Sequence, residues 1–204
     1  MKRILGFAIM LFAVAFSHVA LAQNAVSILD KAASVYRNAG GVKAQFMVSS
    51  EGNSSTGLIM LSGQKFFCNM GGGLMTWFDG KTMWSYVVSN EEVNVTTPTG
   101  AELSRINPYA FLSMYKKNYK ASMGKSTGLY YEVVLNATDS GSSLRKVVIR
   151  ISKSSYHPLY IKLVSRKVVN EITVTGYTDK QKYADSTFRF DSKKYPKAEV
   201  IDLR

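Results

Sequence analysis

The sequence contains a single cysteine, Cys68, and only two histidines. One cysteine cannot form an intramolecular disulfide, so the fold has to be held by its hydrophobic core. Cys68 lies in the stretch K-F-F-C-N-M, which predicts a small buried hydrophobic residue. A histidine-based metal site needs more ligands than His157 and Cys68 can provide. We therefore expect neither a metal ion nor a cofactor.

Catalytic motifs are also lacking. Residues 124–128, G-K-S-T-G, match the pattern of a nucleophile elbow, but they lie between two expected strands and not at a strand-to-helix turn. A P-loop ending at the same Gly-Lys-Ser would need glycine where Tyr119 stands. The 14 carboxylates are scattered, mostly at expected turns. We expect that the protein is not an enzyme. An exported hydrolase, in which two carboxylates distant in sequence meet in the folded chain, is kept as a third hypothesis.

Residues 1–22 have the pattern of a secretory signal peptide. Lys2 and Arg3 precede an apolar run at residues 4–16, and Ala20-Leu21-Ala22 forms an A-x-A cleavage site. The apolar run is too short for a transmembrane helix. No cysteine follows the cleavage site, which argues against a lipid-anchored lipoprotein. We expect an exported, soluble monomer in which residues 23–204 form one domain.

The charge is strongly unbalanced toward cations. The formal net charge is +12, and loss of Lys2 and Arg3 lowers it to +10. A basic exported protein suits an anionic membrane surface or an acidic partner, whereas nucleic acid is not expected outside the cytoplasm. Because the Lys and Arg residues are spread along the chain, an ordinary solvated surface is the simpler interpretation.

Two helices and many strands are expected. Apolar residues recur at helical spacing in residues 24–38, and Gly40-Gly41 ends that helix. From Val42 onward the apolar period changes to two, and about eleven short antiparallel strands follow. Residues 108–117 interrupt them as a second helix that begins with Pro108. The predicted fold is mainly β with helices (α+β), in which the strands curl into a barrel or half-barrel and the helices cover its concave face.

A central hairpin organises these strands. Asp79-Gly80 lies between two β-rich runs and is a strong hairpin signal. On the second run, alternation places Thr82, Trp84, Tyr86 and Val88 on one face. Aromatic and Met residues are frequent in this half of the chain. They can be ordinary core, or they can line a cavity for an apolar ligand, since flexible Met-rich surfaces suit varied ligands.

Five segments together resemble a known family. They are V-K-A-Q-F (residues 42–46), G-L-I-M-L-S-G-Q-K-F-F (57–67), F-D-G-K-T-M-W-S-Y (78–86), N-P-Y-A-F-L (107–112) and the closing F-R-F-D-S-K-K-Y-P-K-A-E-V-I-D (188–202). In this order and spacing the chain resembles the periplasmic outer-membrane lipoprotein carrier proteins, which are LolA-like. The resemblance implies an unclosed β-barrel with helices as a lid over a hydrophobic cavity.

The resemblance also implies a function and a site. Members of the family accept acylated lipoproteins from an inner-membrane releasing transporter and pass them to an outer-membrane acceptor. Positions matching the family's motifs, together with the alternation of the strands and the apolar face of the second helix, predict cavity residues Phe46, Ile59, Leu61, Trp84, Tyr86, Phe111, Leu112 and Met114. The alternative hypothesis is a periplasmic sensor of the same fold that binds a lipidated or protein partner without transport.

One turn departs from the family's pattern. The best-known members have a K-R-P-type turn after the second strand, and its arginine holds the lid closed. The matching stretch here is Leu61-Ser62-Gly63-Gln64-Lys65, so Gly63 stands at the position of the arginine. Lys65 or another basic residue could take over its role.

Overall fold

The structure is a computed structural model that describes residues 24–71, 73–100, 102–103 and 115–204. The expected signal peptide and most of the expected second helix lie outside these residues. In the described part, a helix comprises residues 24–38, and residues 115–118 are also helical. The strands and the two short 3-10 helices are β1 (Gly41–Ser50), β2 (Asn53–Ser62), β3 (Lys65–Met70), β4 (Leu74–Phe78), β5 (Met83–Val87), β6 (Glu92–Thr96), β7 (Tyr119–Met123), β8 (Tyr130–Ala137), β9 (Leu144–Ser152), β10 (Pro158–Ser165), β11 (Val169–Gln181), η1 (Asp185–Phe188), η2 (Ser192–Lys194) and β12 (Glu199–Asp202).

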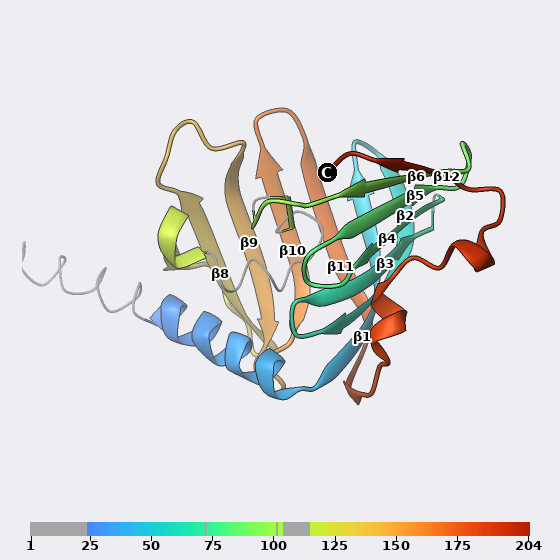
Figure 1. Cartoon of the computed structure of the whole chain (residues 1–204). Coiled ribbons are helices and arrows are strands. Elements are labelled where there is room, and N and C mark those ends of the chain that lie inside the picture. The colour runs from blue at the N-terminus through green and yellow to red at the C-terminus, as the bar shows by residue number, and fades with distance from the viewer. Residues whose placement is uncertain (1–23, 72, 101, 104–114) are drawn as a thin grey trace, which may run out of the picture.

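All twelve strands belong to one sheet. Its order is β12-β6-β5-β4-β3-β2-β1-β11-β10-β9-β8-β7. Two antiparallel meanders, β1–β6 and β7–β11, are therefore joined side by side through the pairing of β1 with β11. The ends of this order, β7 and β12, do not pair with each other, so the sheet stays open and curls into a trough (Figure 1). The predicted unclosed half-barrel is confirmed, with twelve strands where about eleven were expected.

The first helix packs on the inner face of the sheet. Ala25, Leu29, Ala32 and Ala33 follow helical spacing and are buried in the same core cluster as inner residues of β8 and β9. Gly40, with a φ of 71°, reverses the chain into β1 without the steric cost that a Cβ would add. In Figure 1 this helix crosses the lower edge of the trough in front of the β8–β11 half.

The Asp79-Gly80 hairpin forms as expected. Asp79 Oδ1 accepts hydrogen bonds from the backbone N–H groups of Lys81 (3.0 Å) and Thr82 (2.9 Å). Gly80 has a φ of 104°, which favours glycine. This turn fixes the register of β4 and β5 so that Trp77 lies opposite Trp84 and Thr76 lies opposite Ser85. One pair is aromatic and the other small and polar, and the two pairs face opposite sides of the sheet.

The chain end folds over the outer face. Phe190 and Tyr195 cover Trp77 and Tyr86, with ring centroids 5.5 Å apart for Trp77–Phe190 and 4.9 Å apart for Tyr86–Tyr195. The segment is also held by an ion pair of 2.7 Å between Lys65 and Asp185. Its last strand, β12, pairs with β6 in parallel, whereas only antiparallel strands were expected.

No helix within the described residues is long and apolar enough to cross a membrane.

Candidate functional site: an apolar cavity inside the trough

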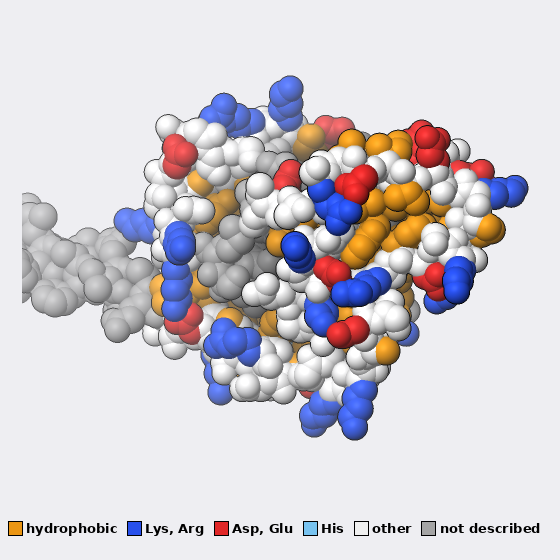
Figure 2. All heavy atoms as spheres, viewed as in Figure 1, with side chains coloured by type: hydrophobic (Ala, Val, Ile, Leu, Met, Phe, Trp, Pro, Cys, Tyr) orange, Lys and Arg blue, Asp and Glu red, His pale blue; other side chains and the backbone are white. Residues whose placement is uncertain are grey.

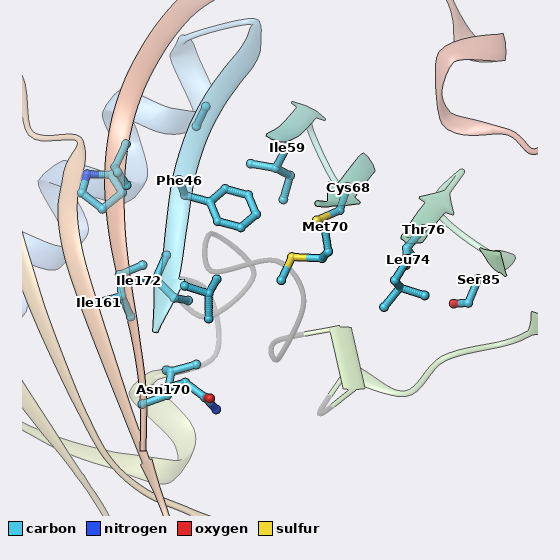
Figure 3. Close-up of a pocket in the computed structure, with 15 residues that line it drawn as sticks. Phe46, Ile59, Cys68, Met70, Leu74, Thr76, Ser85, Ile161, Asn170 and Ile172 are labelled. Atoms are coloured by element: carbon cyan, nitrogen blue, oxygen red, sulfur yellow. The ribbon is translucent and has the colours of Figure 1, made fainter. Parts of the chain in front are cut away.

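A cavity of about 370 Å³ lies on the inner face, between the two halves of the sheet (Figure 3). Its volume is within the range of roughly 300–1,000 Å³ that small-molecule sites occupy. Both meanders contribute to the walls, and most of the side chains are apolar. The lining residues are Ala44, Phe46, Val48, Ile59, Cys68, Met70, Leu74, Thr76, Ser85, Pro158, Ile161, Leu163, Asn170, Ile172 and Val174.

The width of the cavity depends on Phe46 and the glycine opposite. Phe46 of β1 pairs with Gly57 of β2. A Cβ on Gly57 would lie 2.5 Å from Cζ and 2.6 Å from Cε2 of the Phe46 ring. The ring therefore rests in the space that any other residue at position 57 would fill. In Figure 3 Phe46 lies beside Ile59 and faces Cys68 and Met70 across the cavity.

Polar groups are few and lie at two separate places in the cavity wall. Thr76 and Ser85 are cross-strand partners on β4 and β5. Asn170 stands at the start of β11, near the opposite side of the cavity in Figure 3. Such an arrangement provides apolar burial along most of the space and hydrogen-bonding groups near its limits.

Cys68 is buried, as the sequence predicted, and its side chain is part of the cavity wall. Burial in apolar surroundings disfavours the thiolate and raises the pKa of this thiol to about 12. At neutral pH the side chain is an uncharged, weakly polar wall residue and not a nucleophile.

The predicted site residues other than Trp84 and Tyr86 divide into three groups. Phe46 and Ile59 line the cavity. Leu61 is fully buried in the core cluster that includes Phe46 but is not a wall residue. Phe111, Leu112 and Met114 lie outside the described residues. Whether any of these side chains binds a ligand stays a prediction.

The placement of Trp84 and Tyr86 in the cavity is wrong. Both side chains belong to the outer cluster beneath Phe190 and Tyr195, and Ser85 between them faces the cavity instead. Two large aromatics on one strand face require a cover, and alternation alone does not tell which face is inside. Here the cover is the far end of the chain and not a ligand.

Sequence reasoning missed the wall residues of β10 and β11. Ile161 and Leu163 alternate on β10, and Ile172 and Val174 alternate on β11, so the period-two signal was present. What the pattern lacked was the pairing of β1 with β11, which brings these strands next to Phe46.

The contact between the Gly63 turn and the first helix differs from the arginine contact that holds the lid in the best-known members of the family. Gly63 has a φ of 59°. Its carbonyl oxygen accepts a 2.8 Å hydrogen bond from the Tyr36 hydroxyl of the helix. Lys65, the expected substitute, instead pairs with Asp185 of the chain end. Tyr36 thus makes the link between the helix and the β2–β3 turn.

A metal centre has no basis in the described residues, where no group of three or more His, Cys, Asp or Glu side chains could hold an ion.

The fold and the cavity define a class, the open antiparallel half-barrels with an apolar cavity on the inner face. The family model of the outer membrane lipoprotein carrier protein LolA matches residues 15–168. The chain belongs to this family. Family members are binding and carrier proteins, and the resemblance found in the sequence is confirmed.

Solved structures share the fold at low sequence identity. An uncharacterized conserved protein from Thermus thermophilus is 12% identical, with a TM-score of 0.60 over 86% of this chain and 97% of that chain. A DUF1329 family protein from Desulfovibrio piger is 8% identical, with a TM-score of 0.51 over 83% and 97%. A putative outer membrane lipoprotein-sorting protein domain from Vibrio parahaemolyticus is 14% identical, with a TM-score of 0.48 over 82% and 97%. No curated protein sequence matches the chain.

Proposed function

We propose that the protein is a periplasmic carrier that holds acyl chains of lipoproteins, or another lipid, in the cavity and moves them from the inner to the outer membrane. The observation behind this proposal is the composition of the cavity wall, in which apolar side chains of both meanders surround a space of about 370 Å³. Each enclosed CH₂ group contributes about 0.8 kcal/mol, so ten of them contribute about 8 kcal/mol before the ordering of the chain is subtracted.

The cavity has the properties that a carrier needs for loading and release. Within the sheet, the two meanders meet at the pairing of β1 with β11, and the end strands β7 and β12 do not pair with each other. The helix that packs on the inner face is tied to the β2–β3 turn by the Tyr36–Gly63 hydrogen bond. A single neutral hydrogen bond contributes about 0.5–1.5 kcal/mol. A ligand that binds one position of the helix slightly more tightly than another can therefore shift the helix toward that position.

The family supports the assignment to transport between membranes. Under this proposal residues 1–22 direct export to the periplasm, an inner-membrane transporter loads the cavity, and an outer-membrane acceptor empties it. The chain works as a monomer and needs no cofactor.

Photo-crosslinking in living cells tests the proposal. A photoreactive residue at position 172, on the cavity wall, should capture several acylated proteins. The same residue at position 84, on the outer face, is the matched control and should capture none of them. Mass spectrometry identifies the captured species and their acyl chains.

The two rival functions give other results. Capture of one partner that lacks an acyl chain would favour the sensor. Equal capture of acylated proteins from positions 84 and 172 would mean that the cavity is not their binding site. Free lipid alone in the purified protein would keep the cavity as a binding site but remove lipoprotein transport.

A further inference from the structure

Positive charge is distributed unevenly over the fold. Residues 23–114 contain equal numbers of basic and acidic side chains, so the whole net charge of residues 23–204 lies in residues 115–204. Folding brings several of these basic residues to one end of the β7–β11 meander. We call the following exposed residues the basic rim: Lys117, Lys120, Arg145, Lys146, Arg166 and Lys167.

Strand register places the rim at this end. Lys120 of β7 pairs with Asn136 of β8, Asn136 pairs with Lys146 of β9, and the row continues through Val164 to Val169 of β11. Directly opposed residues lie on the same face, so both lysines project from the outer surface together with Val169. Figure 2 shows Lys and Arg side chains projecting from the top of the molecule, where the β8–β9 and β10–β11 connections lie.

The β10–β11 hairpin forms the tip of the rim. Ser165 and Val168 exchange hydrogen bonds: the Ser165 N–H and hydroxyl donate to the Val168 carbonyl (3.0 and 2.8 Å), and the Val168 N–H donates to Ser165 Oγ (3.0 Å). This leaves Arg166 and Lys167 at the two tip positions. Val169, two residues after Lys167, is 39% exposed.

Few acidic groups oppose these cations. Asp139 is the exposed carboxylate in the neighbouring β8–β9 connection, where its Oδ1 accepts the Gly141 N–H. Glu132 is bonded to Arg150 (2.9 Å) and Glu171 to Lys162 (2.6 Å). Although burial opposes the shift, the pKa of the Glu132 carboxyl group is lowered by Arg150 and, to a smaller extent, by Lys146 of the rim, which lies close enough to contribute. In the described part of the chain none of the rim cations forms an ion pair with a carboxylate.

The cavity reaches this same end of the sheet. Leu163 and Asn170 line the cavity and are cross-strand partners. The next pair along the hairpin is Val164 and Val169. The cavity wall therefore begins three residues from each tip cation, at the pair next to Val164 and Val169.

We propose that the basic rim docks the protein on an anionic lipid bilayer, with the β10–β11 tip entering the headgroup layer. The cations lie on the helical residues 115–118, on β7 and β9 and on the β10–β11 hairpin, and they form no single pocket, which suits the diffuse charge of a lipid surface better than a defined site on a partner. An exposed valine beside two tip cations fits the boundary between headgroups and acyl chains. Docking would bring the cavity next to the bilayer; the use of that position for lipid exchange rests on the proposed function.

Vesicle binding by the whole exported chain tests the docking surface. Vesicles of phosphatidylcholine are compared with vesicles in which about one third of the lipid is phosphatidylglycerol, at low and physiological salt. Wild type should bind only the anionic vesicles. Because one basic residue near such a surface is worth roughly a fivefold change in affinity, Lys120→Gln/Lys146→Gln/Lys167→Gln should weaken binding about a hundredfold.

A matched control separates the rim from net charge. Lys43→Gln/Lys125→Gln/Lys182→Gln removes the same charge from exposed lysines away from the rim and should weaken binding less than about tenfold. In addition, an environment-sensitive fluorophore on Val169→Cys in a Cys68→Ala background should respond to anionic vesicles. The same fluorophore on Lys43→Cys should not respond.

Two results would overturn the docking surface. The first is that wild type binds neutral and anionic vesicles equally. Binding to neither kind of vesicle, including a wild type that binds only an acidic protein, has the same meaning. The other is an equal loss in both triple variants. Retention of a fluorescent fatty acid in the cavity is measured separately on each variant. Its absence in wild type would count against the proposed function and leave the docking result unaffected.

Discussion

Gly57→Ala is the substitution that best tests how the cavity holds a ligand. The new Cβ would lie 2.5 Å from Cζ and 2.6 Å from Cε2 of Phe46, distances that real Cβ atoms do not show. It would also lie 3.0 Å from the backbone oxygen of Asn69, which is fixed in β3. The ring is the movable partner. Since the sheet lies behind it, the ring has to turn into the cavity.

The expected loss follows from the space that the ring takes. If the ring displaces two to three CH₂ groups of a bound chain, affinity falls by about 2 kcal/mol, or about 30-fold. The overpacked core also costs about 1–3 kcal/mol of unfolding free energy. Displacement of a fluorescent fatty acid measures the affinity, and chemical denaturation measures the stability.

Two further variants make this experiment decisive. Gly128→Ala adds the same methyl group where nothing lies within 4 Å and should leave both quantities unchanged. Gly57→Ala/Phe46→Leu removes the clashing ring and should recover most of the affinity lost in the single variant. Unchanged affinity in Gly57→Ala, or no recovery in the double variant, would refute the role of Phe46 and Gly57 in setting the cavity width.

Three other predictions concern single groups. Cys68 should react slowly with iodoacetamide, because only about 10⁻⁴ of the thiol is thiolate at pH 8, and a ligand in the cavity should slow the reaction further. Mass spectrometry follows the alkylation, and rapid alkylation of the folded protein would contradict the burial of Cys68. Tyr36→Phe should lower the unfolding free energy by about 0.5–1.5 kcal/mol and speed the exchange of a bound fatty acid in stopped-flow measurements, whereas an unchanged exchange rate would separate the helix from ligand release. Burial lowers the pKa of His157, although the charge of Asp179 opposes the shift, so the folded state favours the neutral imidazole. The resulting contribution to the unfolding free energy is complete above the unfolded pKa of about 6.5 and is lost as the pH falls through the lower pKa of the folded state. Denaturation curves between about pH 7.5 and 5 should show this loss in wild type but not in His157→Phe, which keeps a ring stacked on Tyr177, and equal slopes in both proteins would rule His157 out.

Much of the fold could be read from local patterns. Helical spacing identified residues 24–38, and the Asp79-Gly80 turn identified the hairpin of β4 and β5, because each signal depends on neighbours in sequence. The family resemblance rested on the same local segments and added the half-barrel. Among the predicted cavity residues, Phe46 and Ile59 lie on the cavity wall, and their contact with a ligand stays a prediction.

The errors came where a strand could face either way. Alternation groups Trp84 with Tyr86 but does not say which side of the sheet is the inside. That choice depends on Phe190 and Tyr195, which cover the outer face from the far end of the chain. No local signal in residues 74–97 contains this information.

By itself the sequence determined the open antiparallel half-barrel, the leading helix, the buried Cys68 and the family, since periodicity, turn chemistry and motif order are properties of contiguous residues. Tertiary structure decided three things: which strand faces form the cavity, what ties the first helix to the β2–β3 turn at Gly63, and which lysines and arginines gather at one end of the sheet. The physical reason is the same in each case. Each feature depends on contacts between residues that are not neighbours in sequence: the cavity on the pairing of β1 with β11, more than 100 positions apart, the helix link on Tyr36 and Gly63, 27 positions apart, and the basic rim on the pairings that join β7, β8 and β9.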